Sequence, residues 1–228
     1  MLENTKEQRE IAYTSPRPDV FAMVPTTALS VLDIGCSNGA LGASLRHACR
    51  GRRVFGVEID PAFAVEAQAI LDQVICADLN ELEWPVLTNG MQFDCIIFAD
   101  VLEHLMDPRK HLLEAKRYLR PGGCIVVSLP NIRHISSFYS IFIKGTFPLR
   151  DRGIFDKTHL RWFTINDAKS LIAELGMSVV HTTFNLRMGD RGGGMMNRLA
   201  NKYGTILNFF LIREFLTYQF CLRAEIAK

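Results

Sequence analysis

The chain of 228 residues lacks the features that mark several classes of protein. Its formal net charge is only +2, so the composition gives no electrostatic reason to expect nucleic acid or an anionic membrane as a partner. No uninterrupted apolar run approaches the length of a membrane span. The first ten residues are charged and contain no apolar signal segment. These absences predict a cytoplasmic protein with no membrane span.

Cysteine pairing is a further absence. None of the six cysteines forms a Cys-x-x-Cys pair. Three of them, Cys76, Cys95 and Cys124, lie inside apolar runs and are therefore expected to be buried thiols. Thiols of this kind suit a reducing compartment, which agrees with the cytoplasmic prediction.

What the chain does contain is a regular alternation of strand and helix patterns. Hydrophobic residues make up 48% of the chain, enough for one well-buried α/β domain over residues 1–228. We expect a leader over 1–28 and an insertion over 132–165, within which 135–143 has a helical pattern. The alternation predicts a doubly wound, mainly parallel sheet. The expected strands are 29–34, 53–58, 73–77, 93–98, 123–129 and 218–226, and the expected helices are 40–49, 61–71, 108–119 and 166–175.

The most informative stretch runs from Val31 to Gly42, with the sequence VLDIGCSNGALG. It predicts a short apolar strand that ends in a glycine-containing turn and continues directly into a helix. Gly35 and Gly39 can adopt positive φ and leave room for a ligand against the backbone. The unpaired N–H groups of the following helix point into the same space.

A carboxylate follows at the tip of the next strand. Glu58 lies 19 residues after Gly39, where a carboxylate can accept hydrogen bonds from both hydroxyls of a ribose. The loop lacks the Gly-x-Gly-x-x-Gly spacing of dinucleotide sites and has Asp33 before its first glycine. An acid there repels a phosphate and attracts an ammonium group. The pattern therefore favours a cationic, phosphate-free nucleoside over NAD.

At these residues the chain resembles the class I S-adenosylmethionine-dependent methyltransferases. Their first motif is Asp-x-Gly-x-Gly-x-Gly, and Ser37 stands in place of its middle glycine. Blocks around Asp78, over 93–100 and over 119–123 follow in the family's order. The resemblance implies a seven-stranded, Rossmann-like sheet. The long insertion after the fifth strand is itself expected to be a substrate lid, with a packed connector at the rim as the alternative. It also implies that S-adenosylmethionine contacts Asp33, Gly35, Cys36, Ser37, Gly39, Glu58, Ile59, Asp78, Leu79, Ala99 and Asp100.

A second group of polar residues follows the fourth strand, in the sequence Asp100-Val-Leu-Glu103-His104. On a helical turn these three side chains would share one face. Two carboxylates and an imidazole suit Mg²⁺ or Mn²⁺. Similar Glu-x-x-Glu-His motifs hold a metal in ubiquinone-biosynthesis O-methyltransferases and in small-RNA 2′-O-methyltransferases, and that analogy adds His159. The alternative is that Glu103 and His104 only orient the loop.

His159 has three possible roles in these interpretations. With a metal it completes the ligand set, and the cation acidifies an acceptor hydroxyl. Without a metal, His159 or His104 acts as a general base, because the imidazole pKa is near neutrality. The third possibility is a packed histidine that pins the insertion.

The leader and the insertion together resemble methyltransferases from bacterial surface-polysaccharide gene sets. The matching segments contain Tyr13, Arg17 and residues 153–164. The resemblance implies a glycan or other small-molecule hydroxyl as acceptor, with Tyr13, Arg17 and Arg161 as candidate substrate-binding residues.

Three functional alternatives remain at this stage. The first is metal-assisted O-methylation of a quinol precursor or an RNA 2′-hydroxyl. The second is a non-catalytic scaffold that keeps the nucleoside fold. The third, an NAD-dependent oxidoreductase, is disfavoured by Asp33. The apolar stretch 206–212 is expected to be core or the face of a homodimer.

Overall fold

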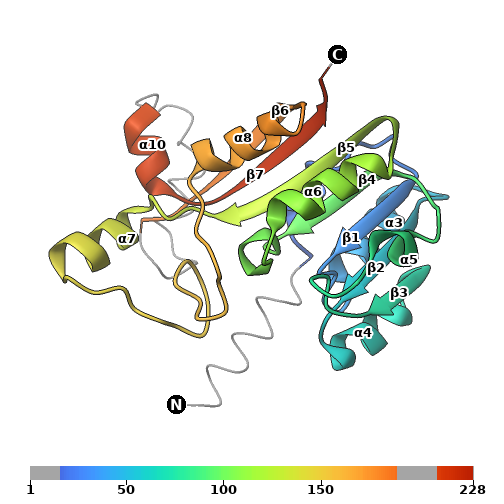
Figure 1. Ribbon diagram of the computed structural model, residues 1–228, viewed down its shortest axis with the longest axis horizontal. Coiled ribbons are helices and arrows are strands. Elements are labelled where there is room, and N and C mark those ends of the chain that lie inside the picture. Colours follow the sequence, from blue (N-terminus) through green and yellow to red (C-terminus); the bar gives the residue numbers. More distant parts are fainter. Residues whose placement is uncertain (1–15, 189–209, 228) are drawn as a thin grey trace.

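Seven strands form a single sheet in the computed structural model, which describes residues 16–188 and 210–227. Their order is β3-β2-β1-β4-β5-β7-β6, as Figure 1 shows. Neighbouring strands from β3 to β5 are parallel, and β7 is antiparallel to both β5 and β6. The predicted mainly parallel α/β sheet is confirmed. The strands are β1 (Ser30–Ile34), β2 (Arg53–Glu58), β3 (Gln73–Cys76), β4 (Phe93–Ala99), β5 (Leu119–Pro130), β6 (Met177–Leu186) and β7 (Thr217–Ile226).

The central strands are apolar along their whole length because both faces of the sheet are covered. All five residues of β1 are buried. Successive side chains point to opposite faces, so Leu32 joins the apolar cluster on one face and Val31 the cluster on the other. This continuous burial places the polar residues of the chain at the strand ends.

Helices cover both faces of the sheet, and most begin at clear signals (Figure 1). The carboxylate of Asp60 accepts the N–H groups of Ala62 and Phe63, and Thr164 and Asp167 form a capping box. The predicted long helices begin within one residue of the observed ones. The helices are α2 (Pro18–Phe21), α3 (Ala40–Ala48), α4 (Pro61–Gln68), α5 (Trp84–Thr88), α6 (Pro108–Arg117), α7 (Ile135–Phe138), α8 (Ile165–Glu174) and α10 (Phe210–Leu216).

Three features differ from the sequence-based expectation. Strand β5 begins at Leu119, four residues before the strand expected over 123–129, and its pairing with β4 shifts register between Phe93 and Cys95. Strand β6 was not predicted, because half-exposed polar residues at the sheet edge break the apolar pattern. Cys76 is exposed at the end of the edge strand β3, whereas Cys95 and Cys124 are buried as expected.

The insertion between β5 and α8 begins with a helical segment, α7 followed directly by a π-helical turn η2 (Tyr139–Ile143). This matches the helix expected over 135–143. The rest of the insertion is held down by a small apolar cluster in which Ile154 and Phe155 pack with Tyr218 of β7. The insertion thus has its own anchor on the sheet. No helix in the described ranges is long and apolar enough to cross a membrane.

Candidate active site

Four carboxylates lie at the carboxyl ends of neighbouring parallel strands. Asp33 is in β1, Glu58 ends β2, and Asp78 and Asp100 follow β3 and β4. Because parallel strands end at one edge of the sheet, these side chains share one edge. The sequence predicted this grouping, since each acid comes at the end of an apolar run.

The loop after β1 has an unusual backbone. Gly35, Ser37 and Gly39 have φ values of 71°, 49° and 82°. A Cβ on Gly35 would lie 2.6 Å from Cγ2 of Val101, so only glycine fits there. Ser37 adopts positive φ without being glycine, which explains how serine replaces the family's middle glycine at a modest cost in strain.

Glu58 is fixed by the loop it faces. One oxygen of its buried carboxylate accepts the N–H of Ser37 at 2.7 Å, and the other accepts the N–H of Asp60 at 2.9 Å. Each oxygen keeps a further lone pair. The carboxylate is therefore held in place while retaining the capacity to accept two hydroxyl hydrogens.

Asp33 is the most electrostatically unusual of these acids. Its side chain is buried, and its Oδ1 has no hydrogen-bond partner within the described residues. Burial raises the pKa of Asp33 to about 7; Arg17 opposes the shift and Glu58 adds to it. A buried acceptor without a partner is costly unless a ligand supplies one. A cationic donor would satisfy Asp33.

The side of the site near β2 and β3 combines apolar and polar groups. Ile59 is 63% exposed although it follows a buried strand, and Leu79 is buried. Asp78 accepts two hydrogen bonds from Asn80, one from its backbone and one from its side chain. The side-chain oxygen of Asn80 in turn accepts the N–H of Met106. Asn80 and Met106 were missed by the sequence reasoning, because neither belongs to a recognisable motif.

Asp100 belongs to a network that reaches across the sheet. Its carboxylate accepts hydrogen bonds from Arg17 at 2.6 Å, from Ser128 at 3.0 Å and from Gln219 at 2.7 Å. The same Arg17 guanidinium also contacts Asp19 at 3.0 Å and Ser128 at 2.8 Å. Arg17 was expected to bind substrate, but here it is engaged by protein groups.

The acidic and histidine residues after β4 are grouped differently from the expected helical turn. The turn η1 (Leu102–His104) begins after Asp100, which has φ of 58° and lies outside it. The carboxylate of Asp100 is therefore directed to Arg17 instead of to the histidines. Glu103, His104 and His159 do come together, with ligand-type atoms within 4.8 Å of one another.

Each member of this trio is held by nearby groups. Glu103 is buried with Oε2 unpartnered, and burial, with a contribution from Asp100, raises its pKa well above the usual range. Nδ1 of His104 lies 3.1 Å from the carbonyl oxygen of Thr158, and Nδ1 of His159 lies 3.2 Å from that of Ile154. A carbonyl partner requires Nδ1–H, which leaves Nε2 with the lone pair in both neutral rings.

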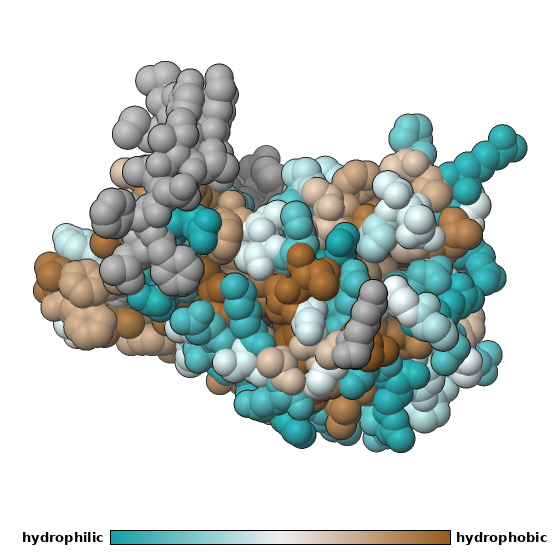
Figure 2. All heavy atoms as spheres, turned by 90° about the horizontal axis from the view of Figure 1, so that it is seen from above, coloured by the Kyte–Doolittle hydropathy of each residue, from teal (hydrophilic) through white to brown (hydrophobic). Residues whose placement is uncertain are grey.

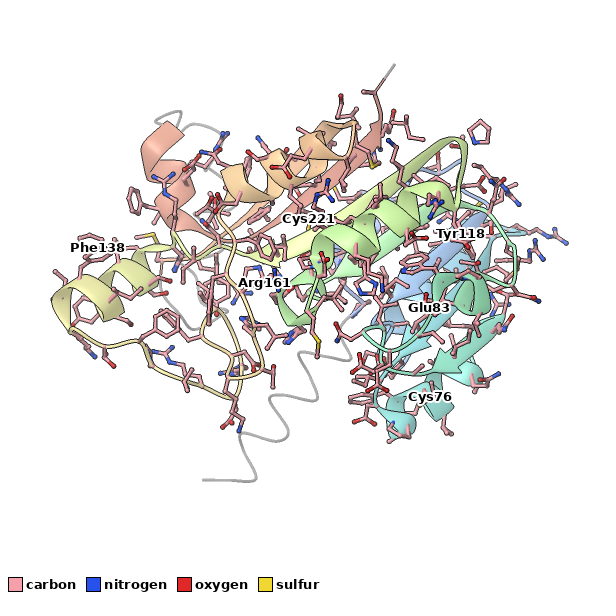
Figure 3. All side chains as sticks on the ribbon, viewed as in Figure 1. Cys76, Glu83, Tyr118, Phe138, Arg161 and Cys221 are labelled. Carbon is pink, nitrogen blue, oxygen red and sulfur yellow. The ribbon has the colours of Figure 1, made fainter. Side chains whose placement is uncertain are left out.

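Arg161, labelled in Figure 3, joins the insertion to the segment after β4. The backbone N–H groups of Leu160 and Arg161 both donate to the carbonyl of Glu103, and the Arg161 guanidinium donates to the carbonyl of Met106. These contacts hold Arg161 beside the segment after β4, although Arg161 lies 55 positions after Met106 in the sequence. Tyr13, the remaining candidate for substrate binding, lies outside the described residues, as do the side chains of 206–212.

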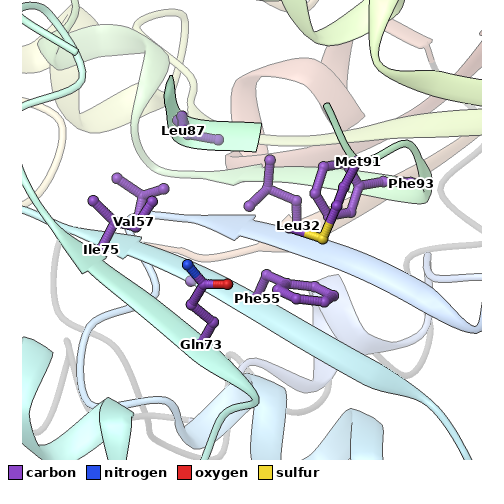
Figure 4. Close-up of a pocket in the computed structure, with 9 residues that line it drawn as sticks. Leu32, Phe55, Val57, Gln73, Ile75, Leu87, Met91 and Phe93 are labelled. Atoms are coloured by element: carbon purple, nitrogen blue, oxygen red, sulfur yellow. The ribbon is translucent and has the colours of Figure 1, made fainter. Parts of the chain in front are cut away.

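Two hollows lie away from this edge. The cavity in Figure 4 has a volume of about 10 Å³ between β1–β4 and α5, room for roughly one water, and its lining is almost wholly apolar. A groove of about 520 Å³ lies between α2 and α3, lined by Pro18, Phe21 and Ala43 among others. Neither contains the acidic strand ends, so the site is identified from its chemistry.

Comparison with known proteins agrees with this geometry. A family model described as a methyltransferase domain matches residues 32–127, which span β1 to β5. Ubiquinone biosynthesis O-methyltransferases are similar. The Azorhizobium caulinodans protein is 29% identical over 202 residues, covering 85% of this chain and 74% of that protein. A Cereibacter sphaeroides protein is 28% identical over 166 residues, covering 71% of this chain and 65% of its own length.

Solved structures share the fold at low sequence identity. Magnesium protoporphyrin IX methyltransferase from Synechocystis PCC 6803 with bound S-adenosylhomocysteine superposes with a TM-score of 0.62 at 18% identity, covering 97% of this chain and 87% of that one. An S-adenosylmethionine-dependent methyltransferase from Mesorhizobium loti superposes with a TM-score of 0.61 at 16% identity, covering 91% of this chain and 95% of that one. Together, the matching methyltransferase domain, the O-methyltransferase relatives and the shared fold support a class I S-adenosylmethionine-dependent methyltransferase. Its cofactor is accordingly S-adenosylmethionine.

Because burial raises the pKa of Asp33, we expect the cofactor affinity to depend on pH. A carboxyl group with a pKa of about 7 is protonated below that pH, whereas the cationic cofactor favours the carboxylate. Affinity should therefore be full above pH 7 and fall about tenfold per pH unit below it. Calorimetric titration of S-adenosylmethionine between pH 5 and 8 measures this, with Asp33→Asn as the control that should be weak and flat. A flat profile in the unsubstituted protein would contradict the role of Asp33.

Proposed function

We propose that this methyltransferase transfers the methyl group to a hydroxyl of a small acceptor, with a sugar as the leading candidate. The observation that carries the proposal is the grouping of Glu103, His104 and His159 beside the cofactor edge, at the end of β4. The sulfonium is already a good leaving centre, so the protein has mainly to align the acceptor and remove its proton. An imidazole with a free Nε2 suits that second task.

In this proposal, each residue of the site has a separate role in binding the cofactor or accepting the proton. Glu58 and Asp78 hold the nucleoside, with Ile59 against the base, and Asp33 attracts the cationic amino-acid end. His159 is the proton acceptor: burial, reinforced by the neighbouring His104, lowers its pKa, so the ring is neutral at physiological pH. The two rings meet edge to face with centroids 4.8 Å apart, which fixes their orientation.

A metal ion also fits this trio, which makes metal-assisted O-methylation the second candidate. The buried, unpartnered Oε2 of Glu103 is an acceptor that needs a proton or a cation, and a ring nitrogen of each of two histidines lies within 4.8 Å of a carboxylate oxygen of Glu103. One oxygen and two nitrogen donors suit Mn²⁺ better than Mg²⁺. A bound cation would lower the pKa of an acceptor hydroxyl. Glu103, His104 and His159 would hold it, whereas Asp100 would stay with Arg17.

The acceptor is tested by a methyl-transfer screen with radiolabelled S-adenosylmethionine. Sugars, nucleotide-linked sugars, quinol precursors and RNA form its four arms. We expect label in a sugar hydroxyl. Label in a catechol-like precursor would instead support the activity named for the ubiquinone relatives, and label in RNA the 2′-hydroxyl alternative. Binding of S-adenosylhomocysteine without any transfer would support the scaffold.

The metal is tested separately, by binding as well as by activity. If the trio holds a cation, Mn²⁺ should bind in a calorimetric titration, and Glu103→Gln should weaken that binding at least about tenfold, since it removes the charged ligand. Asp100→Asn serves as the matched control and should leave Mn²⁺ affinity unchanged. Full transfer activity in chelator would exclude the metal and leave His159 as the general base.

A further inference from the structure

The helical segment 135–143, formed by α7 and η2, is amphipathic, but its apolar face points to the solvent and its polar face points inward. Its solvent-facing positions are the large apolar residues 135, 138, 139, 142 and 143, which follow helical spacing. Its inward positions include Ser137 and Ser140, both buried. A helix that turns its apolar face outward costs free energy unless something covers that face.

The apolar surface continues past the helix. Seven of the 17 exposed large apolar side chains in the described ranges lie within residues 135–149. Phe142 is 71% exposed, Ile143 64% and Leu149 70%. In Figure 1 α7 lies at one extreme end of the molecule, and Figure 2 shows apolar colour at that same end. The surface is therefore a protrusion, not the wall of a groove. We refer to residues 135–149 as the apolar tip.

Positive charge surrounds the apolar tip. The insertion over 132–165 contains six Lys or Arg against two Asp, although the rest of the chain has 20 basic against 22 acidic residues. Lys144, Arg150 and Arg152 are exposed. Of the two acids, Asp156 is buried and Asp151 is paired with Lys157 at 2.7 Å. The nearly neutral net charge thus conceals a local cationic rim.

We propose that the apolar tip docks on the surface of an anionic lipid bilayer. A convex aromatic and aliphatic face flanked by cations is the pattern of helices that lie in the membrane interface. Aromatic side chains such as those of Tyr139 and Phe142 are suited to the headgroup boundary. Anionic headgroups complement the rim, each basic side chain near the surface contributing to the attraction.

The charge distribution disfavours a second copy of this chain as the occupant. A twofold interface would place the same patch on both subunits and bring the two cationic rims together. Docking would also hold the trio of Glu103, His104 and His159 close to the bilayer, because the N–H groups of Leu160 and Arg161, near the end of the insertion, donate to the Glu103 carbonyl. The docking itself does not depend on the acceptor proposed above.

Flotation of the full chain with lipid vesicles tests the proposal. One vesicle is phosphatidylcholine alone, and the other also contains phosphatidylglycerol. We expect binding to the mixed vesicle and much weaker binding to the neutral one. The Phe142→Ser/Ile143→Ser double variant should lower the partition coefficient at least about tenfold, because two exposed apolar side chains no longer enter the interface. Lys144→Glu/Arg152→Glu should lower it about fivefold for each basic charge removed, on anionic vesicles only.

The chain offers a matched control. Val65 on α4 and Val86 on α5 are 73% and 68% exposed, and Val65→Ser/Val86→Ser should bind vesicles like the original protein. Equal loss in this control, or no vesicle binding by the original chain, would overturn the proposal. So would concentration-dependent dimerisation that the Phe142→Ser/Ile143→Ser variant abolishes, which would assign the tip to a second copy. S-adenosylhomocysteine binding is measured on every variant. A variant that loses vesicle binding and keeps S-adenosylhomocysteine binding has lost the docking surface and not the cofactor site, so failure of the docking proposal is distinguished from failure of the proposed function.

Discussion

Replacing Glu58 with alanine is expected to lower the affinity for S-adenosylmethionine by about 100- to 10,000-fold. The substitution removes two charged acceptors for the ribose hydroxyls, each contributing about 1.5–3 kcal/mol. It also frees the N–H groups of Ser37 and Asp60, which Glu58 holds at 2.7 and 2.9 Å, so the loop after β1 loses its partner. Calorimetric titration with S-adenosylmethionine and S-adenosylhomocysteine measures the change.

Two comparisons separate the ribose contact from a general loss of structure. Glu174→Ala removes an exposed carboxylate at the far end of α8 and should leave cofactor affinity unchanged. Glu58→Gln keeps one acceptor oxygen, so its cofactor affinity should lie between those of Glu58→Ala and Glu174→Ala. The same affinity in Glu58→Ala and Glu174→Ala would remove the ribose assignment.

His159→Ala is expected to reduce kcat by about 100- to 10,000-fold, the usual contribution of a positioned proton acceptor. The cofactor site lies on other elements, so affinity for S-adenosylhomocysteine should change less than about twofold. Because Nδ1 of His159 is engaged by the Ile154 carbonyl, the loss is assigned to the chemistry at Nε2. Single-turnover transfer to the acceptor found in the screen gives the rate.

The matched control is His181→Ala, which removes an exposed histidine on the edge strand β6 and should leave kcat unchanged. Partial rescue of His159→Ala by added imidazole would support a proton acceptor over a ligand. An unchanged kcat in His159→Ala, with a lower melting temperature, would instead show that the residue only pins the insertion to η1.

Much of the cofactor edge could be predicted because its signals are local. A short apolar run followed by a glycine turn specifies strand, loop and helix, and strand direction then fixes where Asp33, Glu58 and Asp78 lie. The helices expected over 61–71 and 166–175 begin within one residue of the observed ones, and Asp60 and Thr164 fix these starts because each capping side chain bonds to N–H groups two or three residues away. The edge strand β6 escaped prediction because half-exposed strands carry little periodic signal.

The grouping of Glu103, His104 and His159 and the contacts of Arg17 could be predicted only in part, because they depend on residues distant in sequence. Spacing placed Asp100 with Glu103 and His104, yet a positive φ turned Asp100 toward Arg17, 83 positions earlier in the chain. No local pattern encodes which carboxylate a distant guanidinium will reach. The cationic rim was hidden in the same way, since a net charge of +2 averages over a chain whose local excess of basic over acidic residues lies in the insertion.

By itself, the sequence determined the order of strands β1 to β5 and of helices α3, α4 and α6 between them, the glycine loop and the acids at the strand tips, because these depend on backbone preferences and burial over a few residues. Only the tertiary structure decided that Glu103, His104 and His159 meet, that Asp100 leaves them for Arg17, and that 135–143 turns its apolar face outward. Those outcomes depend on how the insertion packs against η1 and β7, where contacts between distant segments set which side chains can be satisfied together.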